Sequence, residues 1–77
     1  MRFKTDFELY QTIGKNIKRH RESAGLTQTQ LSEKLQISLS YLSKIEATGC
    51  HKSISLSILN HIANVLNTDI ESFFLRG

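Results

Sequence analysis

Hydrogen-bonding side chains recur at helical spacing near the middle of the chain. Ser40, Ser43 and Lys44 lie three and four residues apart, and Leu39 comes directly before them. Residues at this spacing share one face of a helix. A lysine can donate to guanine O6 and N7, serine hydroxyls can donate or accept, and a leucine can contact a thymine methyl group. The pattern predicts base contacts by Leu39, Ser40, Ser43 and Lys44 in a DNA major groove; the alternative is the solvated face of a bundle helix.

Two short helices joined by a tight turn are expected to position these side chains. Thr27 followed by Gln30 forms a capping box, which predicts a helix over residues 28–35. Ser38 is a good cap for a second helix over residues 39–47. Helices this short are marginal alone, so they must pack on each other and on the rest of the chain. The apolar positions that would hold them there are Leu31, Leu35, Ile37, Leu42 and Ile45.

A long helix is expected before this pair. Thr5 and Glu8 have the spacing of a capping box, which predicts a helix over residues 6–24, and Gly25 would end it with a left-handed cap. The expected core stripe of this helix, at spacings of three and four, comprises Phe7, Tyr10, Ile13, Ile17, Arg21 and Ala24.

Two helices are expected after the pair. Ser55 would cap a helix over residues 55–67, and Thr68 or Asp69 would cap a short one over residues 69–75. The expected core stripe of the longer helix comprises Leu56, Leu59, Ile62, Ala63 and Leu66. The fold class is therefore all-α, with five helices.

Length and composition favour one small domain over residues 1–77. Hydrophobic residues make up 39% of the chain and charged residues 22%, with no proline, which suits a compact helical protein. No apolar run approaches the roughly 18 residues of a membrane span, and no signal peptide is evident. A single cysteine cannot form an internal disulfide. We expect a soluble, cytoplasmic protein.

Positive charge is concentrated in the first part of the chain. The net charge is +3, and residues 1–30 hold six Lys/Arg against three Asp/Glu, whereas residues 31–77 hold four of each. Lys15, Lys18 and Arg19 would lie opposite the core stripe of the first helix. Such a patch indicates a polyanionic partner, or else a face that only aids solubility.

Residues 25–46, GLTQTQLSEKLQISLSYLSKIE, resemble the helix-turn-helix of the Cro/CI (XRE) family. Arg21 and the later run LNHIANVLNTDIESFF also fit, so the resemblance covers roughly residues 10–75. Ser32 stands where the family usually has alanine, and Gln36 where glycine is common. The resemblance implies a five-helix, lambda-repressor-like fold that binds double-stranded DNA, and a bacterial or phage-encoded protein.

The resemblance also implies roles for single residues. Arg21 falls on an apolar stripe and needs a partner, because an unpaired buried charge is costly; the family pattern supplies Glu46. Gln28, at a helix N-terminus, is placed to bond a phosphate. Tyr41 is ambiguous, since its ring could pack on the first helix while its hydroxyl reaches a phosphate. Further phosphate contacts are expected from Lys15 and, as in relatives, from the loop residues His51 and Lys52.

Catalytic and metal chemistry find little support in the sequence. Cys50 and His51 are adjacent, but zinc needs three or four ligands and only His20 and His61 remain. His61 is expected to face solvent. There are no paired carboxylates, phosphate loop or nucleophile arrangement, so we expect no enzyme activity, metal, cofactor or small-molecule ligand.

Three consecutive apolar residues near the end suggest a partner surface. Phe73, Phe74 and Leu75 would span about 200° of a helix, so at least one must be exposed. We therefore predict a homodimer held there, with help from Phe3 and Phe7, that regulates transcription from a palindromic operator. The alternative is an antitoxin or adaptor that mainly binds another protein.

Overall fold

The computed structural model describes residues 2–48 and 54–76. Four α-helices and one 3-10 helix follow in the order α1 (Asp6–Ser23), α2 (Gln28–Leu35), α3 (Leu39–Thr48), α4 (Leu56–Val65) and η1 (Ile70–Phe74). The four α-helices were predicted within two residues at each end. No helix in the described part of the chain is long and apolar enough to cross a membrane.

Local hydrogen bonds set the beginning of α1 and its end. The Thr5 hydroxyl accepts from the Glu8 backbone N–H at 3.1 Å, which confirms the predicted cap. The Glu8 carboxylate does not complete a capping box but bonds Arg76 at 2.6 Å. Gly25 adopts φ +73°, the left-handed conformation that ends the helix, as expected.

The turn between α2 and α3 follows the same local rules. Thr27 and Gln30 form the complete capping box, with bonds of 2.9 and 3.1 Å. Gln36 leaves α2 at φ 59°, a left-handed conformation that costs a non-glycine residue on the order of 1 kcal/mol. Ser38 then caps α3 by accepting from the Tyr41 backbone N–H at 3.0 Å. The predicted helix-turn-helix geometry is confirmed.

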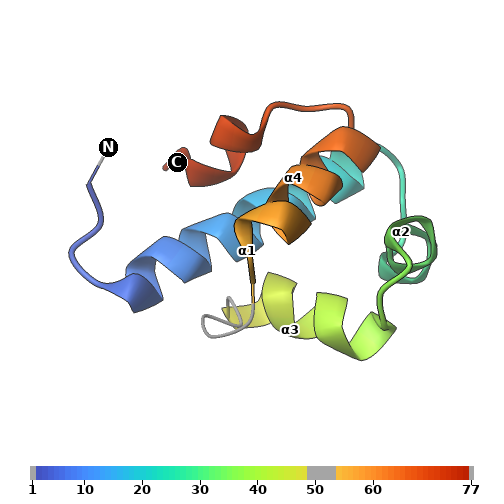
Figure 1. The fold of residues 1–77 in the computed structure, drawn as a ribbon, viewed down its shortest axis with the longest axis horizontal. Helices are drawn as coiled ribbons and strands as arrows, with labels where there is room; N and C mark the ends of the chain where they lie inside the picture. Colours follow the sequence, from blue (N-terminus) through green and yellow to red (C-terminus); the bar gives the residue numbers. More distant parts are fainter. Residues whose placement is uncertain (1, 49–53, 77) are drawn as a thin grey trace.

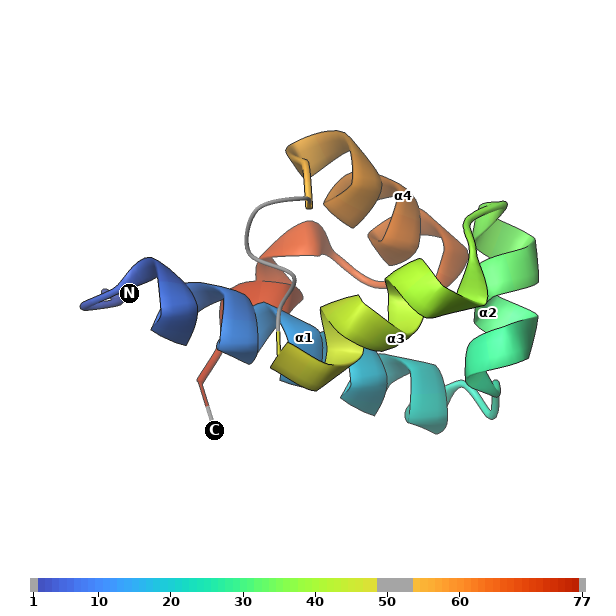
Figure 2. The same ribbon diagram turned by 90° about the horizontal axis from the view of Figure 1, so that it is seen from below.

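The core lies where α1 and η1 meet the helix-turn-helix and α4. Helix α1 packs on both α3 and η1, and α2 packs on α3 and α4. In Figure 1, α4 crosses in front of α1 and α3 lies below them; in Figure 2, seen from below, α3 runs along α1 and α4 lies farther away at the top. The buried apolar residues are Ile13, Ile17, Leu31, Leu35, Leu42, Ile45, Leu59, Ile62, Ala63, Leu66 and Phe73.

Three residues assigned to core stripes face solvent instead. Phe7 is 55% exposed and Leu56 is 71% exposed, and Ala24 is also exposed. Phe7 and Leu56 occupy the first turns of their helices, and Ala24 lies just beyond the end of α1. Helical periodicity identifies the face on which a residue lies, but a helix can extend beyond the neighbour that would cover that face.

The predicted fifth α-helix over residues 69–75 is wrong. Ile70–Phe74 form a 3-10 helix, because so short a segment closes too few hydrogen bonds to nucleate an α-helix. The buried Asn16 of α1 holds its end: Asn16 Nδ2 donates to the carbonyls of Phe73 at 2.8 Å and Leu75 at 2.7 Å. A buried amide that satisfies two carbonyls fixes the exit of the chain without helical continuation.

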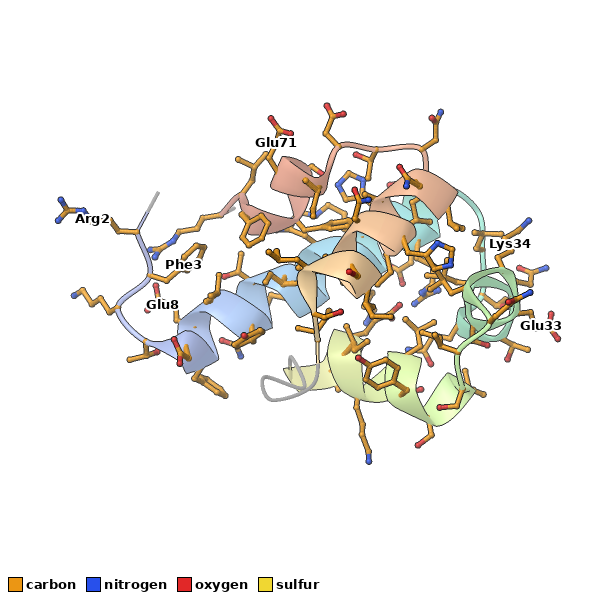
Figure 3. The ribbon with its side chains drawn as sticks, viewed as in Figure 1. Arg2, Phe3, Glu8, Glu33, Lys34 and Glu71 are labelled. Carbon is orange, nitrogen blue, oxygen red and sulfur yellow. The ribbon has the colours of Figure 1, made fainter. Side chains whose placement is uncertain are left out.

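The two terminal segments lie against each other beside the start of α1. Arg76 bonds the Glu8 carboxylate and the Arg2 carbonyl, and its guanidinium lies 4.6 Å from the centre of the Phe3 ring. Figure 3 shows Arg2, Phe3 and Glu8 at this end of the molecule. Glu33 and Lys34 extend from α2 at the opposite end.

Candidate nucleic-acid interface

The outward face of α3 carries the predicted base-contacting residues. Ser40 and Lys44 are exposed and Ser43 is half-buried, while Leu42 and Ile45 on the other face are buried. Leu39, at the first position of α3, is 44% exposed. Ser40, Ser43 and Lys44 fall within an arc of about 100° on the helix surface. The structure therefore brings the four predicted residues to one accessible surface.

Ala47 lies on the same face and was missed from the sequence. It is exposed and stands four residues after Ser43 and seven after Ser40. Its methyl group has the chemistry to contact a thymine methyl. Its spacing from Ser40 and Ser43 indicates the same helix face, but alanine has no polar group that would indicate a base contact.

A buried ion pair anchors α3 to α1. Arg21 Nε donates to Glu46 Oε2 at 2.8 Å and Arg21 Nη2 donates to Oε1 at 3.0 Å, so the contact is bidentate. The two residues are only 8% and 6% exposed. Arg21 Nη1 also donates to the Leu26 carbonyl at 2.8 Å, in the segment that leads to α2. The predicted pair is thus present and also connects the entry to the helix-turn-helix.

The charge of Arg21 is secured by its partner. The hydrogen bond to Glu46 raises the pKa of the Arg21 guanidinium above its ordinary value, against the opposing effect of burial. A raised pKa means that the contribution of Arg21 to stability is present below the pKa of free arginine and is lost only above it. Arginine therefore stays charged at every physiological pH.

Gln28 connects this pair to the outward face of α3. Gln28 Nε2 donates to Glu46 Oε1 at 3.0 Å, and Gln28 Oε1 accepts from the Ser43 hydroxyl at 2.9 Å. The phosphate contact predicted for Gln28 remains compatible with these bonds, since an amide nitrogen has a second hydrogen. The link to Ser43 was not predicted, although Ser43 and Glu46 are three residues apart and hence share one side of α3.

The other predicted phosphate contacts fall into three groups. Tyr41 is half-buried and packs against the core, in keeping with the expected position of its ring. Lys15 is exposed but lies about 120° around α1 from Arg21, where it borders a hollow with Leu75 and Arg76, so the structure does not group it with α3. His51 and Lys52 lie outside the described residues.

The predicted dimer residues differ in exposure. Phe73 is fully buried within this chain, with the centre of its ring 5.6 Å from that of the His20 ring, so the prediction that it forms part of a partner surface is wrong. Phe74 is half-buried and Leu75 is 58% exposed. Only the last two remain available to a second molecule.

Metal ligands do not gather in the described part of the chain. No group of three or more His, Cys, Asp or Glu residues there could hold a metal ion. Cys50 and His51 lie outside that part, so the expectation that they bind no metal stays a prediction. His61 is exposed, as expected, with its Nε2 3.3 Å from the Leu35 carbonyl.

This chain belongs to the helix-turn-helix family of the Cro/CI (XRE) type, because residues 17–73 match the family's sequence model. Proteins of this family are DNA-binding regulators of transcription, and this chain is a regulator of that class, not an enzyme.

Solved structures that are similar to this chain include the following two. One is a crystal structure of SinR, the master regulator for biofilm formation, in complex with DNA; it is 31% identical, with a TM-score of 0.71 over 79% of this chain and 95% of that one. The other is NHTF, a hypothetical transcription factor from Neisseria; it is 20% identical, with a TM-score of 0.80 over 97% of this chain and 84% of that one. The second similarity concerns the fold alone. No curated protein sequence matches this chain.

Proposed function

We propose that this protein is a sequence-specific regulator of transcription that binds a palindromic operator in double-stranded DNA as a homodimer. It would act in the cytoplasm of a bacterium, with α3 in the major groove and α2 crossing the backbone. The observation that carries the proposal is the accessible polar face of α3, on a helix that is fixed to α1 by a buried bidentate ion pair. The similarity to SinR, whose crystal structure is a complex with DNA, supports the proposal that this chain binds DNA.

Each side chain of the outward face has a proposed contact. Lys44 donates to guanine O6 and N7, Ser40 bonds a base edge, and Leu39 and Ala47 contact thymine methyl groups. The remaining serine of this face, Ser43, also bonds a base edge.

Phosphate contacts would set the register of the protein on the duplex. Gln28 binds a phosphate through its second amide hydrogen, helped by the free backbone N–H groups at the start of α2. Tyr41, His51 and Lys52 add contacts around the same groove. Lys15, which is exposed on α1 and borders Leu75, contacts a phosphate farther from α3.

Selection of bound sequences from a random DNA pool tests this function. We expect enrichment of one site with two-fold symmetry and half-sites about 34–36 Å apart. Recovery of no common sequence from the pool would contradict sequence-specific binding and favour the antitoxin or adaptor function.

Lys44→Ala should weaken binding to the selected site by about 1–3 kcal/mol and relax the preference at one base pair. The reason is that a donor on a base edge distinguishes bases, whereas a phosphate contact does not. The measurement is titration of the selected site and of single-base variants. Lys15→Ala is the matched control, with the same loss of charge on α1, and it should leave the base preference intact. If Lys44→Ala weakened all sequences equally, its base contact would have to be abandoned.

The proposed dimer surface lies at the end of the chain. One recognition helix contacts only a few base pairs, so useful specificity calls for two copies related by a two-fold axis. The half-buried Phe74 and the exposed Leu75 border one hollow with Arg2 and Arg76. The exposed Phe7 on α1 could extend this surface, as could the half-buried Phe3.

Leu75→Asp should shift the protein from dimer to monomer while the helices stay folded. Burying a leucine contributes roughly 1.5–3 kcal/mol, and a two-fold interface loses two of them. Sedimentation equilibrium at tens of micromolar measures the shift, and circular dichroism checks the fold. Leu56→Asp is the matched control, because Leu56 is 71% exposed on α4 and does not line the hollow formed with Phe74 and Leu75. A wild-type protein that sediments as a monomer, with and without its DNA site, would rule out the dimer.

A further inference from the structure

A chain of hydrogen bonds runs from the buried ion pair to the outward face of α3. Arg21 donates to both Glu46 oxygens at 2.8 and 3.0 Å, Gln28 Nε2 donates to Glu46 Oε1 at 3.0 Å, and the Ser43 hydroxyl donates to Gln28 Oε1 at 2.9 Å. This series of hydrogen bonds begins at Arg21 and Glu46, which are less than a tenth exposed, and ends at the half-buried Ser43, beside the exposed Lys44.

The direction of every bond in this chain is determined by its buried end. A guanidinium only donates and an ionised carboxylate only accepts. The Gln28 group that faces Glu46 must therefore be the amide nitrogen, which turns the amide oxygen toward Ser43. An amide oxygen only accepts, so the Ser43 hydroxyl has to donate to it.

This direction leaves Ser43 with no hydrogen for DNA. A serine hydroxyl has one hydrogen and two acceptor lone pairs. While this hydrogen is directed at Gln28 Oε1, the group that Ser43 presents outward is an acceptor.

We infer that Ser43 recognises the exocyclic amino group of a base, adenine N6 or cytosine N4, and that Gln28 is the residue that positions it for this. Guanine O6, thymine O4 and purine N7 are acceptors, and an acceptor facing Ser43 would be left without a donor. Phosphate oxygens also only accept, so Ser43 makes no phosphate contact. The inference rests on the proposed function and makes it more specific, because it states which chemical group is recognised at one base.

Ser40 provides an internal comparison on the same face. It is exposed, and its hydroxyl makes no hydrogen bond with any residue in the part of the chain that the structure describes. That hydroxyl can rotate to donate or to accept, so Ser40 tolerates either kind of base group. Two serines three residues apart thus differ in what they recognise, because only one of them is tied to Gln28.

Base analogues test the inference on DNA. In the selected site, one functional group is removed at a time. Purine in place of adenine removes the N6 amino group, and 2-pyrimidinone in place of cytosine removes the N4 amino group. A 7-deazapurine removes N7, and a methylphosphonate removes the charge of one phosphate. Binding is then measured for the wild type, Ser43→Ala, Gln28→Met and Ser40→Ala. Loss of one amino group should weaken wild-type binding about two- to tenfold, and it should have no effect on Ser43→Ala.

The Gln28 variant distinguishes positioning from a direct contact. Gln28→Met frees the Ser43 hydrogen, so the preference for an amino group over a carbonyl at that base should fall toward equality. Ser40→Ala should keep the preference unchanged. Coupling of Ser43 to N7, to a base carbonyl or to a phosphate overturns the inference, as does an unchanged preference in Gln28→Met.

Neutron diffraction from the perdeuterated, DNA-free protein tests the same point without DNA. We expect deuterium on Ser43 Oγ directed at Gln28 Oε1, and the two deuterium atoms of the Gln28 amide on the side of Glu46. A Ser43 deuterium directed at solvent, or the Gln28 oxygen facing Glu46, overturns the inference even if a DNA site is found. If the random pool yields no site, the proposed function fails, whereas the neutron map still decides the direction of these bonds.

Discussion

Replacing Arg21 or Glu46 alone by alanine should lower the free energy of unfolding by about 3–5 kcal/mol. Both side chains are less than a tenth exposed and are joined by two hydrogen bonds. Removing one partner leaves the other charge buried and unpaired, and its desolvation is the largest part of the cost. Glu46→Ala would also leave Gln28 Nε2 without its acceptor. Denaturant unfolding of each variant measures the effect.

A double-mutant cycle separates the pair from its surroundings. The two single changes should be strongly non-additive, because the double variant contains no stranded charge. Glu8→Ala is a suitable control. In its ion pair with Arg76, the Glu8 side chain is 38% exposed and the Arg76 side chain is 51% exposed. Such exposed pairs contribute about 0–1 kcal/mol to the free energy of unfolding. Additive effects of Arg21→Ala and Glu46→Ala would show that the two residues do not act as a pair.

Local chemistry made the helix boundaries predictable from sequence. Thr5, Thr27, Ser38 and Ser55 each accept a hydrogen bond from a backbone N–H three residues later, and each begins a helix where expected. Gly25 and Gln36 end helices in the left-handed conformation. These features depend on a few neighbouring residues, so a short window of sequence contains the information.

Features that depend on contacts between distant segments were not predictable in this way. Phe7 and Leu56 fit the period of a core stripe but lack a neighbour to cover them. The end of the chain leaves a helical path where Asn16, more than fifty residues earlier, bonds the Phe73 and Leu75 carbonyls. No spacing rule connects residues so far apart.

In the candidate site, too, features set by local spacing were predictable and features set by packing between helices were not. Helical spacing placed Ser40, Ser43 and Lys44 on one face, and the structure agrees. The family resemblance supplied the partner of Arg21. The bond between Gln28 and Ser43 depends on how α2 crosses α3, which is a property of the packed pair and not of either helix.

The combined replacement of Ser40, Ser43 and Lys44 by alanine should remove most of the sequence preference of this protein. Specific DNA binding typically exceeds non-specific binding by about 10³–10⁷-fold at physiological salt. Loss of three base contacts, at about 1–3 kcal/mol for a good bidentate pair and less for a single bond, should lower that ratio by about 10²-fold or more. Alanine is the best helix former, so α3 should remain intact. Non-specific, salt-dependent binding should persist, because it depends mainly on phosphate contacts.

The ratio of affinities for the selected site and a scrambled site, measured for this triple variant and for the wild type, tests the central claim most directly. The control is Ser23, Ser57 and Lys18 replaced by alanine, which changes the same residue types and the same charge at exposed positions on α1 and α4. We predict a ratio of about 10³ or more for the wild type and the control, and a ratio reduced by about 10² or more for the variant. A variant that keeps the wild-type ratio would contradict the claim that the outward face of α3 recognises the operator.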